Sequence, residues 1–308
     1  MKNITENPIK YLGILVALFI TYVIAGRLGL SMAFFNHSVS PVWPATGIAI
    51  AALVILGYRF WPAIALGAFV VNLLTTPSMP ISLAIAAGNT LEGLAGAYLI
   101  NKYANKEHAL ENIKTAIRLF LILLVVPIIS ALIGGASLII GGFAAAQNMA
   151  TIGATWWIGD VVGAFVVIPL IFTFAHAPMI KIKKERYAEI ILAFIILLLT
   201  VSILFVGWPI QIDKIYRLVF LCIPPLVWIA LRSCLRITTL ATTLASGIAI
   251  YGTVYNLSIF NLAKINSALI LLQIFIGIIT PMIMHVSIIA TEHEKALERI
   301  KILEKRKR

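Results

Sequence analysis

The chain has 308 residues, of which 61% are hydrophobic and only 12% are charged. Water-soluble globular proteins have about 45–50% apolar and about 25% charged residues, so this composition excludes a soluble globular domain. The net charge of +12 does not indicate nucleic-acid binding, because the basic residues lie at the ends of apolar segments and are not interleaved with aromatic residues. The sequence therefore predicts an all-α fold, a polytopic transmembrane helical bundle with 8–10 spans.

Apolar segments follow one another along the whole chain. Most approach the length of about 20 residues that crosses about 30 Å of hydrocarbon. The first segment is long enough to span and shows no signal-peptide cleavage pattern. The second and third are short and are separated only by residues near Arg59, so they are either two thin spans or a re-entrant pair. In chain order, the predicted spans are 11–35, 44–57, 60–75, 80–100, 117–140, 152–174, 188–207, 216–232, 237–256 and 268–290.

The basic residues predict the orientation of these spans. With the amino terminus placed in the cytoplasm, 20 of the 24 Lys and Arg residues fall in inner loops and tails, and three fall in outer loops. This asymmetry follows the positive-inside rule. We therefore expect both termini to be cytoplasmic and the protein to reside in a bacterial inner membrane.

Three ionisable residues lie well inside apolar segments: Arg27, Glu92 and Asp160. A charge at the centre of a span costs about 2.5–3.5 kcal/mol on insertion scales, so each carboxyl needs a partner, a proton or water. Helical spacing places Asn89 on the face of Glu92 and Trp156 on the face of Asp160. Two interpretations stay open. The three ionisable residues form a network that fixes helix packing, or they form a site that binds a ligand or senses protons.

Prolines and tryptophans interrupt the chain at the predicted outer face. Trp43 and Pro44 precede the second apolar segment, and Trp156 and Trp157 begin the sixth near the outer interface. Each tryptophan is either an anchor at the level of the headgroups or part of a ligand site, because broken helices beside intramembrane polar groups form such sites in transporters. We expect a cavity that opens to the periplasm and is floored by the two carboxyl groups. The Gly-x-x-x-Gly step at residues 159–163 predicts close approach of another segment.

Several kinds of chemistry have no signature in the sequence. It contains no phosphate-binding Gly-x-x-x-x-Gly-Lys loop, no nucleophile elbow and no histidine spacing that would hold a metal. We therefore expect no metal, no cofactor and no enzymatic activity within these residues. Cys222 and Cys234 are too few for a disulfide framework and are predicted to be buried apolar fillers.

After the last apolar segment the chain becomes charged without a turn signal. We expect residues 1–290 to form the membrane domain and residues 291–308 to form a cytoplasmic helical tail. The tail is either a helix that ends on anionic lipid or a parallel dimeric signalling helix. The second interpretation rests on residues at steps of three and four: Val286, Ile289, His293, Ala296, Ile300 and Leu303.

Five sequence motifs occur in a fixed order over about residues 10–295. They are Pro-Val-Trp-Pro-Ala-Thr-Gly at 41–47, Leu-Gly-Tyr-Arg-Phe-Trp-Pro at 56–62, Gly-Asn-Thr-Leu-Glu-Gly at 88–93, Trp-Trp-Ile-Gly-Asp-Val-Val-Gly at 156–163 followed by Pro169, and Pro-Pro-Leu-Val-Trp-Ile-Ala-Leu-Arg at 224–232 followed by Gln273. In this order they resemble the membrane-associated sensor domains of the first type (the MASE family), the integral-membrane input modules of bacterial sensor kinases and cyclic-di-GMP enzymes. The resemblance implies eight to ten spans, a sensory role and a functional set at matching positions: Trp43, Pro44, Asn89, Glu92, Trp157, Asp160 and Arg232.

The sequence departs from the common pattern of that family because it ends at Arg308 without an output domain. We expect either a stand-alone sensor that acts through a partner kinase or a shortened product. The expected function is detection of a periplasmic or membrane-derived signal, with an unknown small-molecule or lipid-derived ligand and with membrane lipids and a homodimer or sensor kinase as partners. The alternatives are a small proton-coupled secondary transporter that uses Glu92 or Asp160, and a structural subunit of a membrane complex.

Overall fold

The computed structural model describes residues 7–32, 40, 42–106, 108–175, 182, 184–207, 216–255, 257 and 265–307. Over these ranges every regular element is a helix, as the composition predicts. The chain divides into two compact units: Met1–Lys106 with Arg118–Ile168 (unit 1), and Glu107–Ile117 with Pro169–Arg308 (unit 2).

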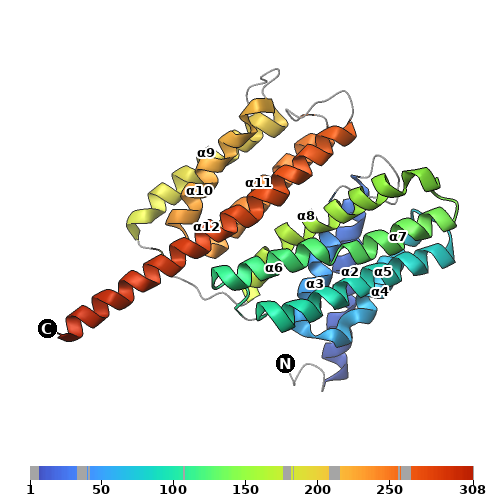
Figure 1. Ribbon diagram of the computed structural model, residues 1–308, viewed down its shortest axis with the longest axis horizontal. Coiled ribbons are helices and arrows are strands. Elements are labelled where there is room, and N and C mark those ends of the chain that lie inside the picture. Colours follow the sequence, from blue (N-terminus) through green and yellow to red (C-terminus); the bar gives the residue numbers. More distant parts are fainter. Residues whose placement is uncertain are drawn as a thin grey trace. The chain divides into compact units, whose positions relative to one another are not determined.

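Unit 1 is a bundle of long and short helices (Figure 1). A 3-10 turn, Tyr58–Phe60, lies between the helices Pro44–Leu56 and Trp61–Leu73, and a π-helical turn, Ile100–Ala104, extends the helix Met79–Leu99. The helices of this unit are α2 (Pro8–Leu30), α3 (Pro44–Leu56), α4 (Trp61–Leu73), α5 (Met79–Leu99), most of α6 (Ile113–Val125), α7 (Ile128–Ile140) and the greater part of α8 (Met149–Ala175).

Helix α3 lies inside unit 1, between α5 and α8. It has 13 residues, and none of them is exposed. A Cβ atom on Gly96 of α5 would come within 2.9 Å of Ile50 of α3, and a Cβ atom on Gly47 of α3 would come within 2.6 Å of Val167 of α8. Small residues on both sides therefore let the backbones approach closely. At about 20 Å, α3 is shorter than the hydrocarbon layer of about 30 Å, so it covers only part of its depth.

Two short helices, α3 and α4, form the segment predicted to be either two thin spans or a re-entrant pair. The tight turn between them depends on Gly57, whose φ of +103° is in the region that favours glycine. This turn contacts its neighbours at one end of unit 1: Tyr11 donates a hydrogen bond to the Arg59 carbonyl at 2.9 Å, and Asn101 donates one to the Tyr58 hydroxyl at 2.9 Å. The segments predicted to face the cytoplasm in unit 1 therefore meet at the same end.

The predicted span 117–140 is not one straight helix. Helix α6 ends at Val125 and α7 begins at Ile128, with Pro127 between them. Proline lacks the N–H that a continuous helix needs and its ring clashes with the preceding turn, so the helix breaks there. The two helices together still form one candidate span, Ile113–Ile140.

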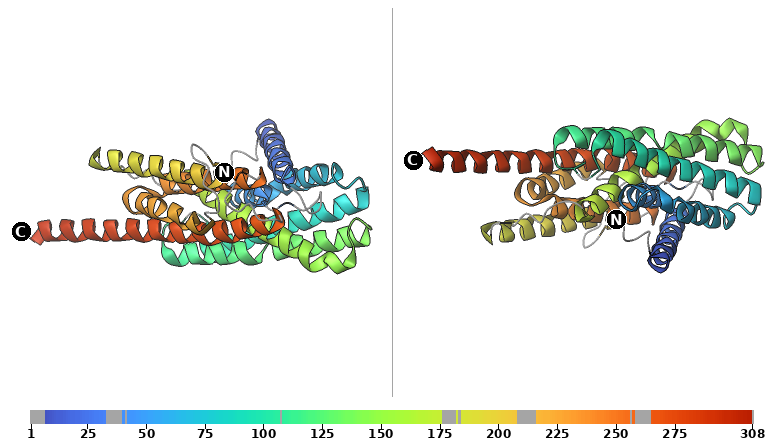
Figure 2. Two further views of the ribbon diagram at one scale, coloured as in Figure 1. Left: turned by 90° about the horizontal axis from the view of Figure 1, so that it is seen from above. Right: turned by 90° about the horizontal axis from the view of Figure 1, so that it is seen from below.

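Unit 2 contains the end of α8 and the helices α9 (Tyr187–Val206), α10 (Ile223–Arg232), α11 (Leu235–Val254) and α12 (Ile265–Lys307). Helix α12 has 43 residues and is therefore about 64 Å long, about twice the hydrocarbon thickness. Both views of Figure 2 show it projecting beyond α9 and α10. It continues without a break across residue 290, so the predicted tail and the last span are one helix.

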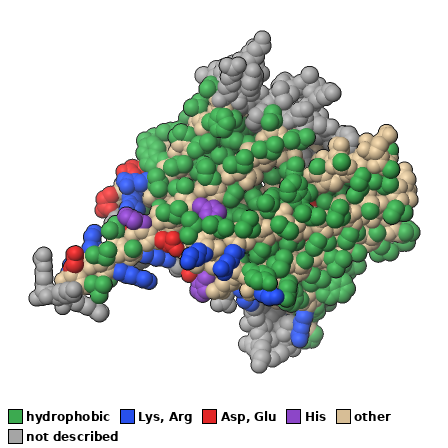
Figure 3. All heavy atoms as spheres, in the orientation of Figure 1, with side chains coloured by type: hydrophobic (Ala, Val, Ile, Leu, Met, Phe, Trp, Pro, Cys, Tyr) green, Lys and Arg blue, Asp and Glu red, His purple; other side chains and the backbone are tan. Residues whose placement is uncertain are grey.

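By length and composition, seven helices of the described ranges can cross a membrane. Three shorter apolar helices accompany them: Pro44–Leu56, Tyr58–Leu73 and Leu218–Arg232. Figure 3 shows hydrophobic side chains over most of the visible surface, whereas charged side chains gather toward its lower left, on the projecting part of α12 and beside it. The predicted polytopic helical bundle is thus confirmed, and the cytoplasmic placement of its termini stays a prediction.

Candidate functional site

Two carboxyl groups are buried close together in unit 1. Glu92 of α5 is 1% exposed and Asp160 of α8 is 0% exposed. The hydroxyl of Thr46 in α3 lies 3.0 Å from Oδ1 of Asp160 and 3.4 Å from Oε2 of Glu92, and Ser130 of α7 donates a hydrogen bond of 2.7 Å to Oδ2 of Asp160. We call Thr46, Glu92, Ser130 and Asp160 the carboxyl site. Because four helices each contribute one residue, any change in this site acts on all four.

The Thr46 hydroxyl cannot serve both carboxyl groups equally. A hydroxyl has one proton to donate, so it satisfies one carboxylate at a time. The contact to Asp160 is the shorter, and the contact to Glu92 becomes a full hydrogen bond only if Thr46 turns toward it or if Glu92 itself donates a proton. The site therefore has more than one hydrogen-bonding arrangement, and these depend on protonation and on bound species.

The position of Thr46 follows from how α3 begins. Pro44 occupies the first turn of α3, where a missing N–H costs nothing. The Trp43 N–H donates a hydrogen bond to the Gly159 carbonyl at 3.0 Å, which attaches the start of α3 to α8. A Cβ atom on Gly163 would overlap the Trp43 carbonyl, so this approach requires glycine. The segment that approaches the predicted Gly-x-x-x-Gly step is thus the start of a short helix, whose positive dipole end stabilises negative charge at the carboxyl site.

Arg27 is not part of this site. It lies on the face of α2 that carries the exposed side chains Ile20 and Ile24, at spacings of four and three residues, whereas Tyr22 and Gly26 lie on the buried face. The interpretation that Arg27 pairs with the carboxyl groups is therefore wrong. Near the end of its helix, a long arginine side chain can extend to the membrane interface instead. No Lys, Arg or His is buried within the described ranges, so the two acids have no buried basic partner there.

Further polar groups surround the carboxyl site. The hydroxyl of Tyr22 lies close to Trp43, Asn89 and both carboxyl groups. At this site, four buried atoms have no hydrogen-bond partner among the described residues: Trp43 Nε1, both polar atoms of the Asn89 amide, and Glu92 Oε1. Leaving a buried polar group unpaired costs about 1–3 kcal/mol, so such a concentration of unpaired atoms marks a place for water or a ligand.

A small cavity adjoins Asp160. Its volume is about 10 Å³, which is room for about one water molecule. The expected cavity floored by both carboxyl groups is thus only partly present, because Glu92 does not line it. Its lining residues are Ser40, Trp43, Asn72, Trp156 and Asp160.

The neighbouring tryptophans Trp156 and Trp157 have different surroundings. Trp156 lines the cavity and belongs to a hydrophobic cluster with Ile85, Ala131, Leu138 and Ile152. Trp157 is half-buried, and its indole N–H donates a 2.8 Å hydrogen bond to the Leu124 carbonyl of α6. The structure therefore places Trp156 beside the carboxyl site and uses Trp157 to connect α8 with α6.

The sequence was compared with models of known protein families. The model of the MASE1 family matches residues 14–294, a range that contains the whole carboxyl site and Arg232. The chain belongs to the MASE1 family. It is thus a multi-pass membrane sensor domain, as the sequence motifs predicted.

One curated relative of this MASE1 domain is the probable diguanylate cyclase DgcE of Escherichia coli (strain K12). The two are 24% identical over 202 residues, which are 63% of this chain and 18% of DgcE. The MASE1 chain thus matches less than a fifth of the length of that relative. No solved structure matches the chain significantly.

Arg232 of the MASE1 domain belongs to unit 2 and has its own partner. Its guanidinium makes two hydrogen bonds to Glu189 of α9, at 2.6 and 2.9 Å, so the pair is bidentate. Nearby, Arg186 pairs with Glu294 of α12 at 3.0 Å. These ion pairs connect α9, α10 and α12 where α12 begins to project. Arg232 was predicted as a functional residue from its motif, whereas Glu189 and Glu294 were not.

We expect the substitution Glu294→Lys to loosen α12 next to this ion-pair cluster. It removes the partner of Arg186 and places a second positive charge near Arg232. Hydrogen–deuterium exchange of peptides covering residues 287–300 should become faster than in the wild type. Glu304→Lys makes the same charge change farther along α12 and serves as the control. Equal exchange in the two variants would show that the Arg186–Glu294 pair does not hold the helix.

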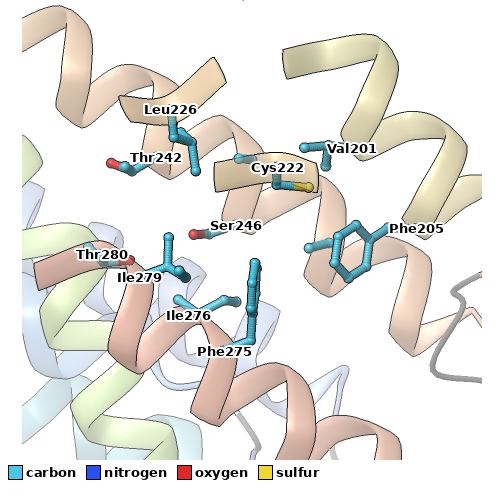
Figure 4. Close-up of a pocket in the computed structure, with 12 residues that line it drawn as sticks. Val201, Phe205, Cys222, Leu226, Thr242, Ser246, Phe275, Ile276, Ile279 and Thr280 are labelled. Carbon is cyan, nitrogen blue, oxygen red and sulfur yellow. The ribbon is translucent and has the colours of Figure 1, made fainter. Parts of the chain in front are cut away.

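A second cavity lies inside unit 2, with a volume of about 20 Å³ (Figure 4). Its wall is mostly apolar, with hydroxyl groups from Thr242, Ser246 and Thr280. Cys222, predicted to be a buried filler, is buried in this wall, whereas Cys234 is only half-buried. The part of α12 immediately before Pro281 supplies four lining residues, so this helix has free space beside it: Phe275, Ile276, Ile279 and Thr280.

Proposed function

We propose that this MASE1 domain detects a periplasmic or membrane-derived signal at the carboxyl site and transmits it through α12 to a cytoplasmic output module or partner kinase. The observation on which the proposal depends is that two acids, with no buried basic partner among the described residues, join four helices in unit 1. A species that binds or protonates these acids changes the hydrogen bonds that hold the four helices. Such a species shifts a conformational equilibrium only if it binds two states with different affinity, and the alternative hydrogen bonds of Thr46 supply such states.

The shape and surface of α12 support its part in this proposal. The helix runs unbroken from the candidate span into its charged projecting end. Beyond residue 288 it exposes three large apolar side chains of the predicted seam, at positions that suit pairing with the same helix of a second copy: Ile289, Ile300 and Leu303. In this arrangement the tail lies in the cytoplasm of a bacterial cell, and movement of paired α12 helices controls the output. The name of DgcE favours cyclic-di-GMP synthesis as one such output.

The proposal is tested by joining α12 of the full chain, without a change of helical phase, to the catalytic part of a diguanylate cyclase. Cyclic-di-GMP is then measured in cells. We expect Asp160→Asn to change the basal output at least about fivefold, the range of ordinary coupling free energies, because it removes a charge on which four helices converge. Glu92→Gln should act in the same way. The exposed acid Glu111 provides the control, Glu111→Gln.

Immunoblots of membranes should show equal amounts of each fusion. Output that stays at the wild-type level in both Asp160→Asn and Glu92→Gln would refute the proposed site. Asp160-dependent ion flux in proteoliposomes, without any effect on the fusion, would favour a transporter instead.

A further inference from the structure

The charge of the carboxyl site is unbalanced. Glu92 and Asp160 are buried, and no basic side chain is buried with them in the described ranges. Taking carboxylates out of water is strongly unfavourable unless a positive charge or a proton accompanies them. The site thus gains stability from a proton or a cation taken up from solution.

The atoms around the site are oxygen ligands that have unused capacity. Glu92 Oε1 and Asn89 Oδ1 accept no hydrogen bond from the described residues. Asp160 and the hydroxyls of Thr46 and Ser130 add further oxygens within hydrogen-bonding distance of one another. Carboxylate, amide and hydroxyl oxygens are the ligands that hard cations prefer. The unpaired indole N–H of Trp43 lines the adjoining cavity, where it can donate to a water that completes the cation's shell.

Size and charge limit which cation fits. The cavity beside Asp160 holds about one water molecule, so it has no room for an organic ligand. The described residues contain no group of three or more His, Cys, Asp or Glu side chains that could hold a metal ion, which disfavours Ca²⁺ and transition metals. When one of the two carboxyl groups keeps its proton, a single positive charge balances the other carboxylate. This leaves a small monovalent cation, either an alkali ion or ammonium.

We infer that the carboxyl site binds one small monovalent cation in competition with protons. Glu92, Asn89 and Asp160 supply the direct oxygen ligands, and the cavity lined by Trp43 and Asn72 holds a water of the coordination shell. This inference deepens the proposed function. It rests on that function for one consequence only, namely that the external cation concentration and the pH control the signalling output.

The test uses the purified full chain in lipid nanodiscs, titrated with NaCl, KCl or NH₄Cl against N-methyl-D-glucamine chloride at constant ionic strength. Trp43 and Trp156 line the cavity, so tryptophan emission reports occupation directly. We expect a saturable change with at least one of the three salts and none with N-methyl-D-glucamine. Lowering the pH should raise the apparent dissociation constant by up to about tenfold per unit, because cation binding releases a proton.

Two variants and a second measurement support the test. Glu92→Gln and Asn89→Leu should each weaken binding at least about tenfold, since the first removes a negative charge and the second removes an oxygen ligand, whereas Glu111→Gln should bind like the wild type. The rise of the thermal unfolding midpoint with salt gives an independent measure of binding and shows whether each variant is folded.

The possible results separate this inference from the proposed function. Emission and unfolding midpoints that follow pH but no cation, or that respond equally to N-methyl-D-glucamine, overturn the inference, and the fusion experiment can still support a sensory site. Saturable cation binding together with a fusion insensitive to Asp160→Asn supports the cation site and refutes signalling through it.

Discussion

Gly163→Ala is expected to destabilise the protein by about 3 kcal/mol, whereas Gly153→Ala in the same helix is expected to be neutral or slightly stabilising. The added methyl group at Gly163 would overlap the backbone carbonyl of Trp43, which cannot move aside like a flexible side chain. A methyl group at Gly153 meets nothing within 4 Å. At that open position alanine gains about 0.5–1 kcal/mol in helix propensity over glycine.

Thermal unfolding of the purified variants in detergent micelles measures this difference. The Gly163→Ala change should also alter the output of the cyclase fusion, because displacing Trp43 moves the start of α3 and withdraws Thr46 from the carboxyl groups. If both glycine variants unfolded at the same temperature, the close approach of α3 to α8 would be wrong.

Gly252→Ala in α11 is expected to have an effect of similar size on unit 2. A Cβ atom at Gly252 would overlap the Phe205 carbonyl at the end of α9, again a contact with backbone. Gly247 lies in the same helix with nothing within 4 Å, so Gly247→Ala is the matched control. We expect a loss of about 3 kcal/mol for the first variant and no loss for the second.

Hydrogen–deuterium exchange shows where the Gly252→Ala loss is located. Exchange should increase in α9 and α11 of this variant and stay unchanged in α2, which belongs to unit 1. Equal exchange in α9 for Gly252→Ala and Gly247→Ala would contradict the contact between Gly252 and Phe205.

The spans were predictable because the hydrophobicity of a segment depends only on its own residues and not on which other segments it contacts. The expected first span, 11–35, corresponds to α2 at Pro8–Leu30, and the short pair 44–57 and 60–75 corresponds to α3 and α4. The break at Pro127 was missed although proline is its visible cause, since the apolar run continues on both sides. The unbroken length of α12 was partly predictable, because no Gly or Pro follows Pro281.

The site was less predictable because it depends on which faces meet in three dimensions. Glu92 and Asp160 stand out in sequence as acids inside apolar segments. Thr46 and Ser130 do not, because intramembrane Ser and Thr usually bond to the preceding helical turn, as Thr90 does with the Ala86 carbonyl. Their positions just after Pro44 and Pro127, at helix starts, were the available signal. Arg27 could not be excluded from the sequence, because its helix is apolar on every face; only the structure shows that it shares a face with exposed Ile20 and Ile24.

The central position of α3 changes what its sequence must satisfy. None of its residues is exposed and eight of the 13 are buried, so protein rather than lipid covers most of its surface. Side-chain volume, and not affinity for hydrocarbon, then decides which residues it accepts. Among related sequences we expect alanine, glycine, serine and threonine to interchange along this helix, while a leucine at the position of Ala45 or Ala51, both 0% exposed, would be rejected although it is the more lipophilic residue.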